Sequence, residues 1–242
     1  MTDAQLPHSF DDEDRGTWSL LMESCRTRLR QHGCAQARAG FEALELSEHI
    51  ESMHAVDKRL HDLSGWHMQP VEGLVSDQHF YGLLRNKHFP TAPTMRKRSE
   101  LEFAEFPDLF HDVVGHLPIL VDRAYGDFLT GFAGIALRHL DSEPVMKALA
   151  RFYWFTTETG LVEEDGGTKI LGGAILTSSA EAANAMGDPA RRTALTVSEV
   201  FATDYDIFDL QQKYFVASSY EALLSVLDEL EEAAQALRAS HV

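Results

Sequence analysis

The sequence predicts a single catalytic domain that is mainly α-helical with a little β structure. Apolar residues recur at near-helical spacing along most of the 242 residues, and good N-cap residues precede several of these segments. A short strand is expected only at residues 168–170. The chain has no internal repeat or low-complexity linker. We therefore divide it into a flexible acidic N-terminal segment, residues 1–16, and one catalytic domain, residues 17–242.

The N-terminal part of the predicted domain is helical and ends in a loop. Apolar residues follow a helical pattern across residues 17–63. Glycine and proline residues then interrupt the chain over residues 65–73. Ser76 is well placed to cap a short helix that continues to Leu84.

Two further helices are predicted around a proline-rich region. Pro107 suits the first turn of one helix, which Gly115 and Pro118 are expected to end. Asp122 can cap the next helix, which continues to about Leu140.

The C-terminal part is predicted to hold most of the remaining elements. Ser142 can cap a helix that continues to about Glu158. Residues 163–167 are typical of a turn and lead into the strand at 168–170. Two or three further helices follow, the last over about residues 220–238.

Composition excludes several classes of protein. The formal charge of −17 leaves no basic surface for nucleic acid, and it disfavours anionic membranes. No apolar run approaches the roughly 18 residues of a membrane span, and the N-terminus has no apolar signal region. Two cysteines, Cys25 and Cys34, make neither a disulfide framework nor a thiolate zinc site. We expect a cytoplasmic protein.

The most informative segment is residues 106–120, which contains His111 and His116. On an unbroken α-helix, five positions correspond to about 500°, so the two imidazoles would point about 140° apart. They can converge only if the backbone unwinds near Gly115. Their neighbours are mostly apolar, and a buried imidazole in such surroundings needs a polar partner or a metal. The alternative is that they are ordinary hydrogen-bonded histidines, as most of the 12 are expected to be.

Glu158 is the best candidate for a third ligand. It follows the aromatic run at residues 152–155, and a carboxylate there is costly unless it meets a cation. Two histidines and one carboxylate with open positions are typical of non-haem Fe(II) oxygenases. Trp154 lies one helical turn before Glu158, and Ala150 one turn before Trp154, so the three share a helix face. The alternative is a solvated glutamate beside ordinary core aromatics.

Other catalytic motifs are absent or weak. A zincin needs histidines four positions apart with a glutamate after the first, so a metal hydrolase is disfavoured. A 2-oxoglutarate oxygenase normally has an acid two residues after the first histidine, where this chain has Val113. No nucleophile elbow and no phosphate-binding glycine loop occur.

With these residues the chain resembles the pterin-dependent aromatic amino acid hydroxylases, and most closely the short bacterial phenylalanine 4-hydroxylases. The resemblance extends over about residues 17–227 and implies the single-domain catalytic fold of that family. Four sequence blocks carry it, and a fifth matches more loosely: residues 72–77, Phe89-Pro90 with Arg96, residues 106–120, residues 153–161, and residues 172–179.

The resemblance implies a role for each matching position. The iron ligands of the family are matched by His111, His116 and Glu158. Its pterin-binding positions are matched by Gly73, Val75, Asp77, Phe80 and Ala150. Arg96 matches the residue that pairs with the substrate carboxylate, and Asp108 the acid that steadies this arginine. The amino acid pocket is matched by Trp154, Thr177 and Ser178, with Glu181 in support. Tyr153 matches a position near pterin and iron, and Asp112 is expected to orient water or pterin there.

The implied activity is hydroxylation of an aromatic amino acid ring with Fe(II), a tetrahydropterin and O₂, most simply of phenylalanine to tyrosine. Open alternatives are a same-scaffold oxygenase that acts on tryptophan or a secondary-metabolite precursor, and a non-catalytic homologue that binds pterin or amino acid. The chain departs from the family pattern at residues 91–95, at Phe106 and at residues 172–174, and Ala174 and Thr177 add bulk beside the amino acid site. These changes bear on substrate and ring position. We expect a monomer, because the additions found in tetrameric members are missing.

Overall fold

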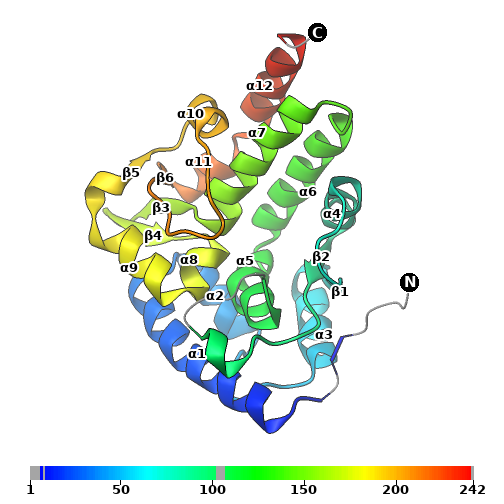
Figure 1. Cartoon of the computed structure of the whole chain (residues 1–242), viewed down its shortest axis with the longest axis vertical. Coiled ribbons are helices and arrows are strands. Elements are labelled where there is room, and N and C mark those ends of the chain that lie inside the picture. The colour runs from blue at the N-terminus through cyan, green and yellow to red at the C-terminus, as the bar shows by residue number, and fades with distance from the viewer. Residues whose placement is uncertain (1–5, 8, 102–106, 241–242) are drawn as a thin grey trace.

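The computed structural model describes residues 6–7, 9–101 and 107–240, and it confirms a mainly helical fold with little β structure (Figure 1). The longer helices are α1 (Asp12–His32), α2 (Ala35–Ala43), α3 (Met53–Ser64), α4 (Asp77–Arg85), α6 (Arg123–Arg138), α7 (Glu143–Tyr153), α9 (Ser179–Gly187) and α12 (Leu227–Ala239). The shorter ones are α5 (Leu117–Leu120), α8 (Gly173–Thr177), α10 (Val197–Ala202) and α11 (Tyr220–Leu224). Among the described residues, no helix is long and apolar enough to cross a membrane.

Two small sheets complete the fold. Strands β1 (His67–Pro70) and β2 (His88–Thr91) form a parallel pair. A four-stranded sheet has the order β4-β3-β6-β5, from β3 (Leu161–Glu164), β4 (Gly167–Ile170), β5 (Arg192–Ala194) and β6 (Tyr214–Ala217). The predicted strand at residues 168–170 is confirmed as most of β4, but the other strands were missed. Each has only three or four residues, too few to show an alternating pattern.

The first helix begins earlier than predicted. Asp11 caps α1, since its side chain accepts a hydrogen bond from the Asp14 amide at 2.8 Å and the Asp14 carboxylate accepts one from the Asp11 amide. The acidic first turn also suits the positive end of the helix dipole. Residues 12–16 therefore belong to the helix, which begins before the start predicted at residue 17. Residues 1–5 and 8 of the predicted flexible segment, and Phe106, lie outside the described residues.

Several helix starts are as predicted, while the lengths of some helices are not. Ser76 caps α4 and Asp122 caps α6, each through a side-chain hydrogen bond to the first turn. The segment at residues 17–63 is divided into α1, α2 and α3, and the last predicted helix is divided into α11 and α12. Helical periodicity alone does not reveal these short breaks.

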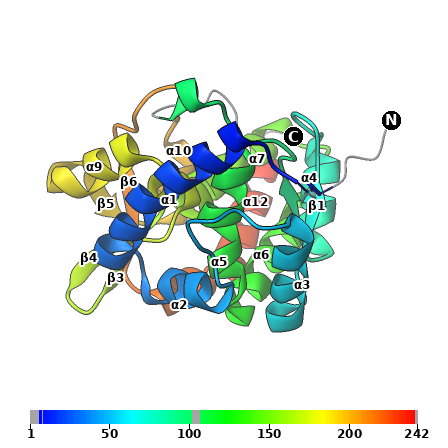
Figure 2. The ribbon, with the colours of Figure 1, turned by 90° about the horizontal axis from the view of Figure 1, so that it is seen from below.

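The buried core extends through most of the chain, and one part of it lies where α2, α3 and α8 meet the helical segment that ends in α5. Figure 2 shows α5 between α2 and α3, and both of these helices pack against it. The side chains of Leu109, Phe110, Val113 and Val114, which precede α5, are completely buried. The segment that carries the predicted histidines is therefore a central element of the core.

Candidate active site

The two predicted histidines lie on a π-helix. Residues 111–116 form η2 (His111–His116), which continues into α5 without a break. In a π-helix the backbone hydrogen bond spans five residues, so side chains five positions apart lie one above the other. The Nε2 atoms of His111 and His116 are consequently only 3.0 Å apart. The expectation that Gly115 and Pro118 end the helix is wrong, because the helix widens instead of unwinding.

Glu158 reaches the same point from a second π-helix, η3 (Trp154–Glu158), which extends α7. Its Oε2 atom lies 3.4 Å from His111 Nε2 and 3.3 Å from His116 Nε2. These side chains are 13%, 12% and 3% exposed. Two ligands at right angles around an ion with bonds of about 2.1 Å are about 3.0 Å apart. The three donor atoms therefore fit three adjacent coordination positions of a single ion, and the positions on the opposite side of that ion stay open.

Asp112 offers a second carboxylate near the histidines. Ligand atoms of His111, Asp112 and His116 lie within 4.8 Å of one another. However, Asp112 Oδ2 accepts a hydrogen bond from the Ala92 amide at 2.7 Å. Glu158 lies closer to both imidazoles and is the better third ligand by geometry. Burial raises the pKa of Asp112 to about 6, although the neighbouring His111 opposes this change.

The charge of Glu158 requires a positive partner. Burial pushes the pKa of this carboxyl upward, but the charge of His116 and hydrogen bonds from both imidazoles outweigh it and hold the pKa well below its usual range. Burial lowers the pKa of His111, and the bond to Glu158 reverses that effect and raises it. A cation between the three groups would serve in place of a proton.

Thr177 and Gly173 fix the two imidazoles from behind. The Thr177 hydroxyl donates to the Gly173 carbonyl at 2.8 Å and lies 3.1 Å from His111 Nδ1. Because its proton is already used, the hydroxyl must accept from His111 Nδ1–H, which leaves the Nε2 lone pair for a metal. His116 packs between Phe89, at 4.9 Å between ring centroids, and Gly173. A Cβ atom on residue 173 would lie 2.6 Å from that ring.

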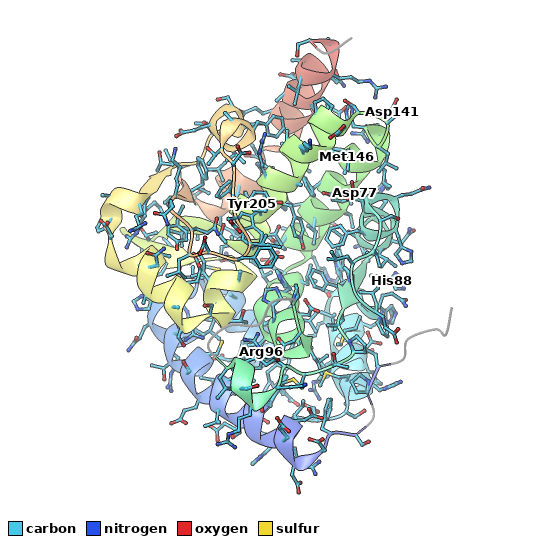
Figure 3. The ribbon with its side chains drawn as sticks, viewed as in Figure 1. Asp77, His88, Arg96, Asp141, Met146 and Tyr205 are labelled. Atoms are coloured by element: carbon cyan, nitrogen blue, oxygen red, sulfur yellow. The ribbon has the colours of Figure 1, made fainter. Side chains whose placement is uncertain are left out.

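Arg96 and Asp108 form a buried pair next to this centre (Figure 3 labels Arg96). The carboxylate binds Arg96 Nε at 3.0 Å and Nη2 at 2.8 Å, in bidentate geometry. It also accepts from the His111 amide at 3.0 Å, which ties the arginine to the first turn of the histidine segment. Burial opposes ionisation, but hydrogen bonds from Arg96 prevail and lower the pKa of Asp108.

The predicted pterin positions occupy two places. Gly73 lies in the loop before α4, with a φ of +65° that suits glycine. Val75 follows it in that loop, and Asp77 begins α4 on the surface. The Phe80 ring meets Tyr153 edge-to-face, with 5.3 Å between centroids. This contact brings α4 to the end of α7, on which Ala150 also lies.

The predicted amino acid positions meet a loop of residues 203–213. Trp154 stacks on Tyr205, with 4.8 Å between ring centroids, and its indole Nε1 donates to Gln211 Oε1 at 3.0 Å. Glu181 accepts from the Gln211 amide at 3.2 Å. The side chain of Ser178 caps α9 through the Glu181 amide.

Comparison with known proteins places this chain in a family. The sequence model of one protein family, the biopterin-dependent aromatic amino acid hydroxylases, matches residues 3–239. The chain belongs to this family. The phenylalanine-4-hydroxylase of Caulobacter vibrioides is 34% identical over 220 residues, which cover 90% of this chain and 74% of that relative.

Solved structures of related hydroxylases have the same fold. The Chromobacterium violaceum phenylalanine hydroxylase with bound iron(III) and 7,8-dihydrobiopterin superposes with a TM-score of 0.87 at 28% identity, and the match covers 97% of this chain and 87% of that one. The Legionella pneumophila phenylalanine hydroxylase gives 0.86 at 32% identity, with coverage of 98% and 96%.

Sequence reasoning about this hydroxylase missed Tyr205 and Gln211. They lie in a polar loop without periodicity or a motif, so no local signal marks them. The one available clue was Trp154, because a partly buried indole N–H requires an acceptor.

Proposed function

We propose that this protein uses Fe(II), a tetrahydropterin and O₂ to hydroxylate the ring of an aromatic amino acid, and that its substrate is phenylalanine, which becomes tyrosine. The convergence of His111, His116 and Glu158 at 3.0–3.4 Å, beside a buried arginine, is the observation that carries the proposal. The names of the relatives, phenylalanine-4-hydroxylases, support the choice of substrate.

In this proposal the three converging side chains hold the iron and leave the opposite positions open. Neutral imidazoles and a carboxylate are suitable donors for Fe(II). The bound metal and pterin together supply the activation of O₂. The role of the chain is to place the reactants and exclude water, and the burial of the three ligands is suited to this role.

Arg96 binds the carboxylate of the amino acid. Asp108 takes two of the five N–H donors of the guanidinium and fixes its plane, so the other donors remain for a second carboxylate. Asp108 also accepts a hydrogen bond from the His111 amide. Arg96, which anchors the substrate, and His111, which binds the metal, therefore keep fixed positions relative to each other.

Aromatic residues place the two rings. Phe80 stacks on the pterin, with Tyr153 against its edge, and Trp154 forms the wall of the amino acid pocket. Asp112, held by the Ala92 amide, orients water or pterin beside the iron. Gly73, Val75, Asp77 and Ala150 line the pterin side.

A product-resolved assay tests the proposal. The iron-loaded protein is given tetrahydrobiopterin, O₂ and, in turn, phenylalanine, tyrosine and tryptophan, and the hydroxylated products are separated by chromatography. We expect tyrosine from phenylalanine at the highest kcat/KM. Preferential hydroxylation of tryptophan would overturn the substrate. Oxidation of the pterin without any hydroxylated product would point to another substrate, and absence of iron and turnover to a binding homologue.

We also propose that the enzyme acts as a monomer in the cytoplasm. Of the exposed large apolar side chains in the described residues, one lies on α1, one on α3, one in the loop before α4 and three in the loop of residues 203–213, and they form no broad helix face suited to an obligate interface. Burial raises the pKa of Cys25 and Cys34 to about 11, so both free thiols stay protonated. Light scattering after gel filtration should give the mass of one chain, and a dimer mass would contradict the proposal.

A further inference from the structure

We propose that Gln211 is a positioning residue for the amino acid substrate, because it fixes the orientation of the Trp154 wall through the loop of residues 203–213. This loop is called the Tyr205 loop below. The inference deepens the proposed function and rests on it for its kinetic part, whereas its spectroscopic test does not require turnover.

The side chain of Gln211 can adopt only one orientation. Its Nε2 donates to two backbone carbonyls of the Tyr205 loop, Asp206 O at 2.6 Å and Asp209 O at 3.0 Å. An amide oxygen in that place would face two acceptors and be repelled. The Oε1 atom must therefore point to Trp154 Nε1–H, 3.0 Å away. Only 5% of Gln211 is exposed, so each of these bonds is protected from water.

The backbone of Gln211 is anchored as firmly as its side chain. The amide donates to Glu181 Oε1 at 3.2 Å, and the carbonyl accepts from Asn184 Nδ2 at 2.7 Å. Glu181 also accepts from the Tyr214 hydroxyl, to which Asn184 donates at 2.7 Å. Gln211 is thus held to α9 and β6 by Glu181, Asn184 and Tyr214. Its fixed position restrains the Trp154 indole that it binds.

Both restraints on the Trp154 indole come from the Tyr205 loop. Tyr205 covers one face of the indole with an interplanar angle of 12°, and Gln211 binds its edge. Between these two residues the loop turns Ile207 and Phe208 outward, where they are 48% and 53% exposed. The wall lies on the same π-helix as Glu158, but its angle is set by the loop.

The contacts that anchor Gln211 also connect it to the helix next to His111. Glu181 lies on α9, which directly follows α8, and Thr177 at the end of α8 contacts His111. The Trp154 wall is therefore held through α9, which adjoins the helix that contacts a metal ligand. A substrate ring placed against Trp154 is thereby placed relative to the iron position.

The central experiment replaces Gln211 by methionine, which has a similar length but no side-chain hydrogen bonds. We expect Gln211→Met to raise the KM for phenylalanine about tenfold and to lower the tyrosine formed per pterin oxidised, because the wall loses its edge restraint. The KM for pterin and the iron content should not change. Gln212→Met is the matched control, because Gln212 is the exposed neighbour and its side chain bonds to Leu210 and Arg191 and does not contact Trp154 in the described structure.

A double-mutant cycle shows whether Gln211 acts through the wall. Trp154→Phe keeps an aromatic ring but has no N–H to donate. In that background Gln211→Met should change the KM less than twofold. A full tenfold effect in both backgrounds would overturn the proposal, as would a Gln211→Met enzyme that behaves like Gln212→Met.

Tryptophan emission provides a test that is independent of turnover. Trp18 and Trp66 are 1% and 0% exposed, so Trp154 is the partly exposed indole. Gln211→Met should shift the emission to longer wavelength and lower its anisotropy, and neither change should occur in the Trp154→Phe background. If Gln211→Met does not fold, Trp154→Phe alone must raise the KM for phenylalanine. Unchanged emission, or an unchanged KM in that case, would refute the positioning role.

Discussion

The Nδ1 atom of His111 lies 3.1 Å from the Thr177 hydroxyl, whose own proton is directed at the Gly173 carbonyl. This relationship selects the tautomer of His111 in which Nε2 is free to bind a metal. The resemblance to the family implies a place for Thr177 in the amino acid pocket, and the structure shows in addition that its hydroxyl contacts His111. Four predictions follow from this contact and its neighbours.

Thr177→Val should lower the affinity for Fe(II) by about tenfold to a hundredfold, because the replacement cannot accept from His111 Nδ1–H. The measurement is a competitive titration of Fe(II) against a chelator at fixed pH. Thr177→Ser is the control, since it keeps the hydroxyl and should bind iron as the wild type does. Equal iron affinity in the valine variant would show that the tautomer is set elsewhere.

Glu158→Gln should abolish tight iron binding and reduce hydroxylation by more than about a hundredfold, because the donor set loses the anion that lies within 3.4 Å of both imidazoles. Asp112→Asn tests the competing carboxylate and should keep the iron content. Metal analysis after dialysis distinguishes the two variants, and circular dichroism verifies their folding. Loss of iron from Asp112→Asn alone would transfer the ligand role to Asp112.

Arg96→Lys should raise the KM for phenylalanine about a hundredfold and leave the KM for pterin unchanged. Lysine keeps the charge but cannot bind Asp108 in bidentate geometry and present a fixed plane to the substrate. Steady-state kinetics with each reactant varied in turn gives both constants. Lys97→Arg, at the exposed neighbouring position, is the control. Normal phenylalanine saturation in Arg96→Lys would rule out Arg96 as the anchor.

Gly173→Ala should displace His116, since the added Cβ would lie 2.6 Å from its ring. We expect iron binding to be lost, with thermal stability lowered by the overpacking, at a cost of about 1–3 kcal/mol. Gly82→Ala provides the contrast, because nothing lies within 4 Å of a Cβ at that position of α4. Calorimetry and metal analysis report the two effects separately. A Gly173→Ala protein with full iron content would contradict this packing.

Much of the fold was accessible from local sequence signals. Ser76 and Asp122 were recognised as helix caps because capping depends on one side chain and the next three amides. The strands other than β4 and the helix break near Ser225 were not recognised, because they depend on contacts between distant segments and involve only a few residues each. Asp11 and Asp14 indicated the early start of α1 as a capping pair, but the high acidity of residues 1–16 favoured a flexible segment instead.

For the site, the sequence identified the residues that converge but not the form of backbone that brings them together. Five-residue spacing of His111 and His116 indicated a departure from the α-helix, and a break was the simplest solution. A π-helix has no sequence signature of its own, because tertiary packing stabilises it. Tyr205 and Gln211 were inaccessible for the same reason, since their partners are 51 and 57 positions away, counted from residue 205 to 154 and from 211 to 154.

Both metal-facing turns, η2 and η3, enclose one residue more than ordinary helical turns do. Deleting a single amino acid from either turn would restore regular helix and rotate a donor atom away from its companions, even though every donor would still be present. The count of residues in these turns is therefore as much a requirement for the cofactor centre as their chemical identity. A sequence search that scores the three donor residues but permits deletions within η2 or η3 would therefore accept chains that cannot bring these donors together.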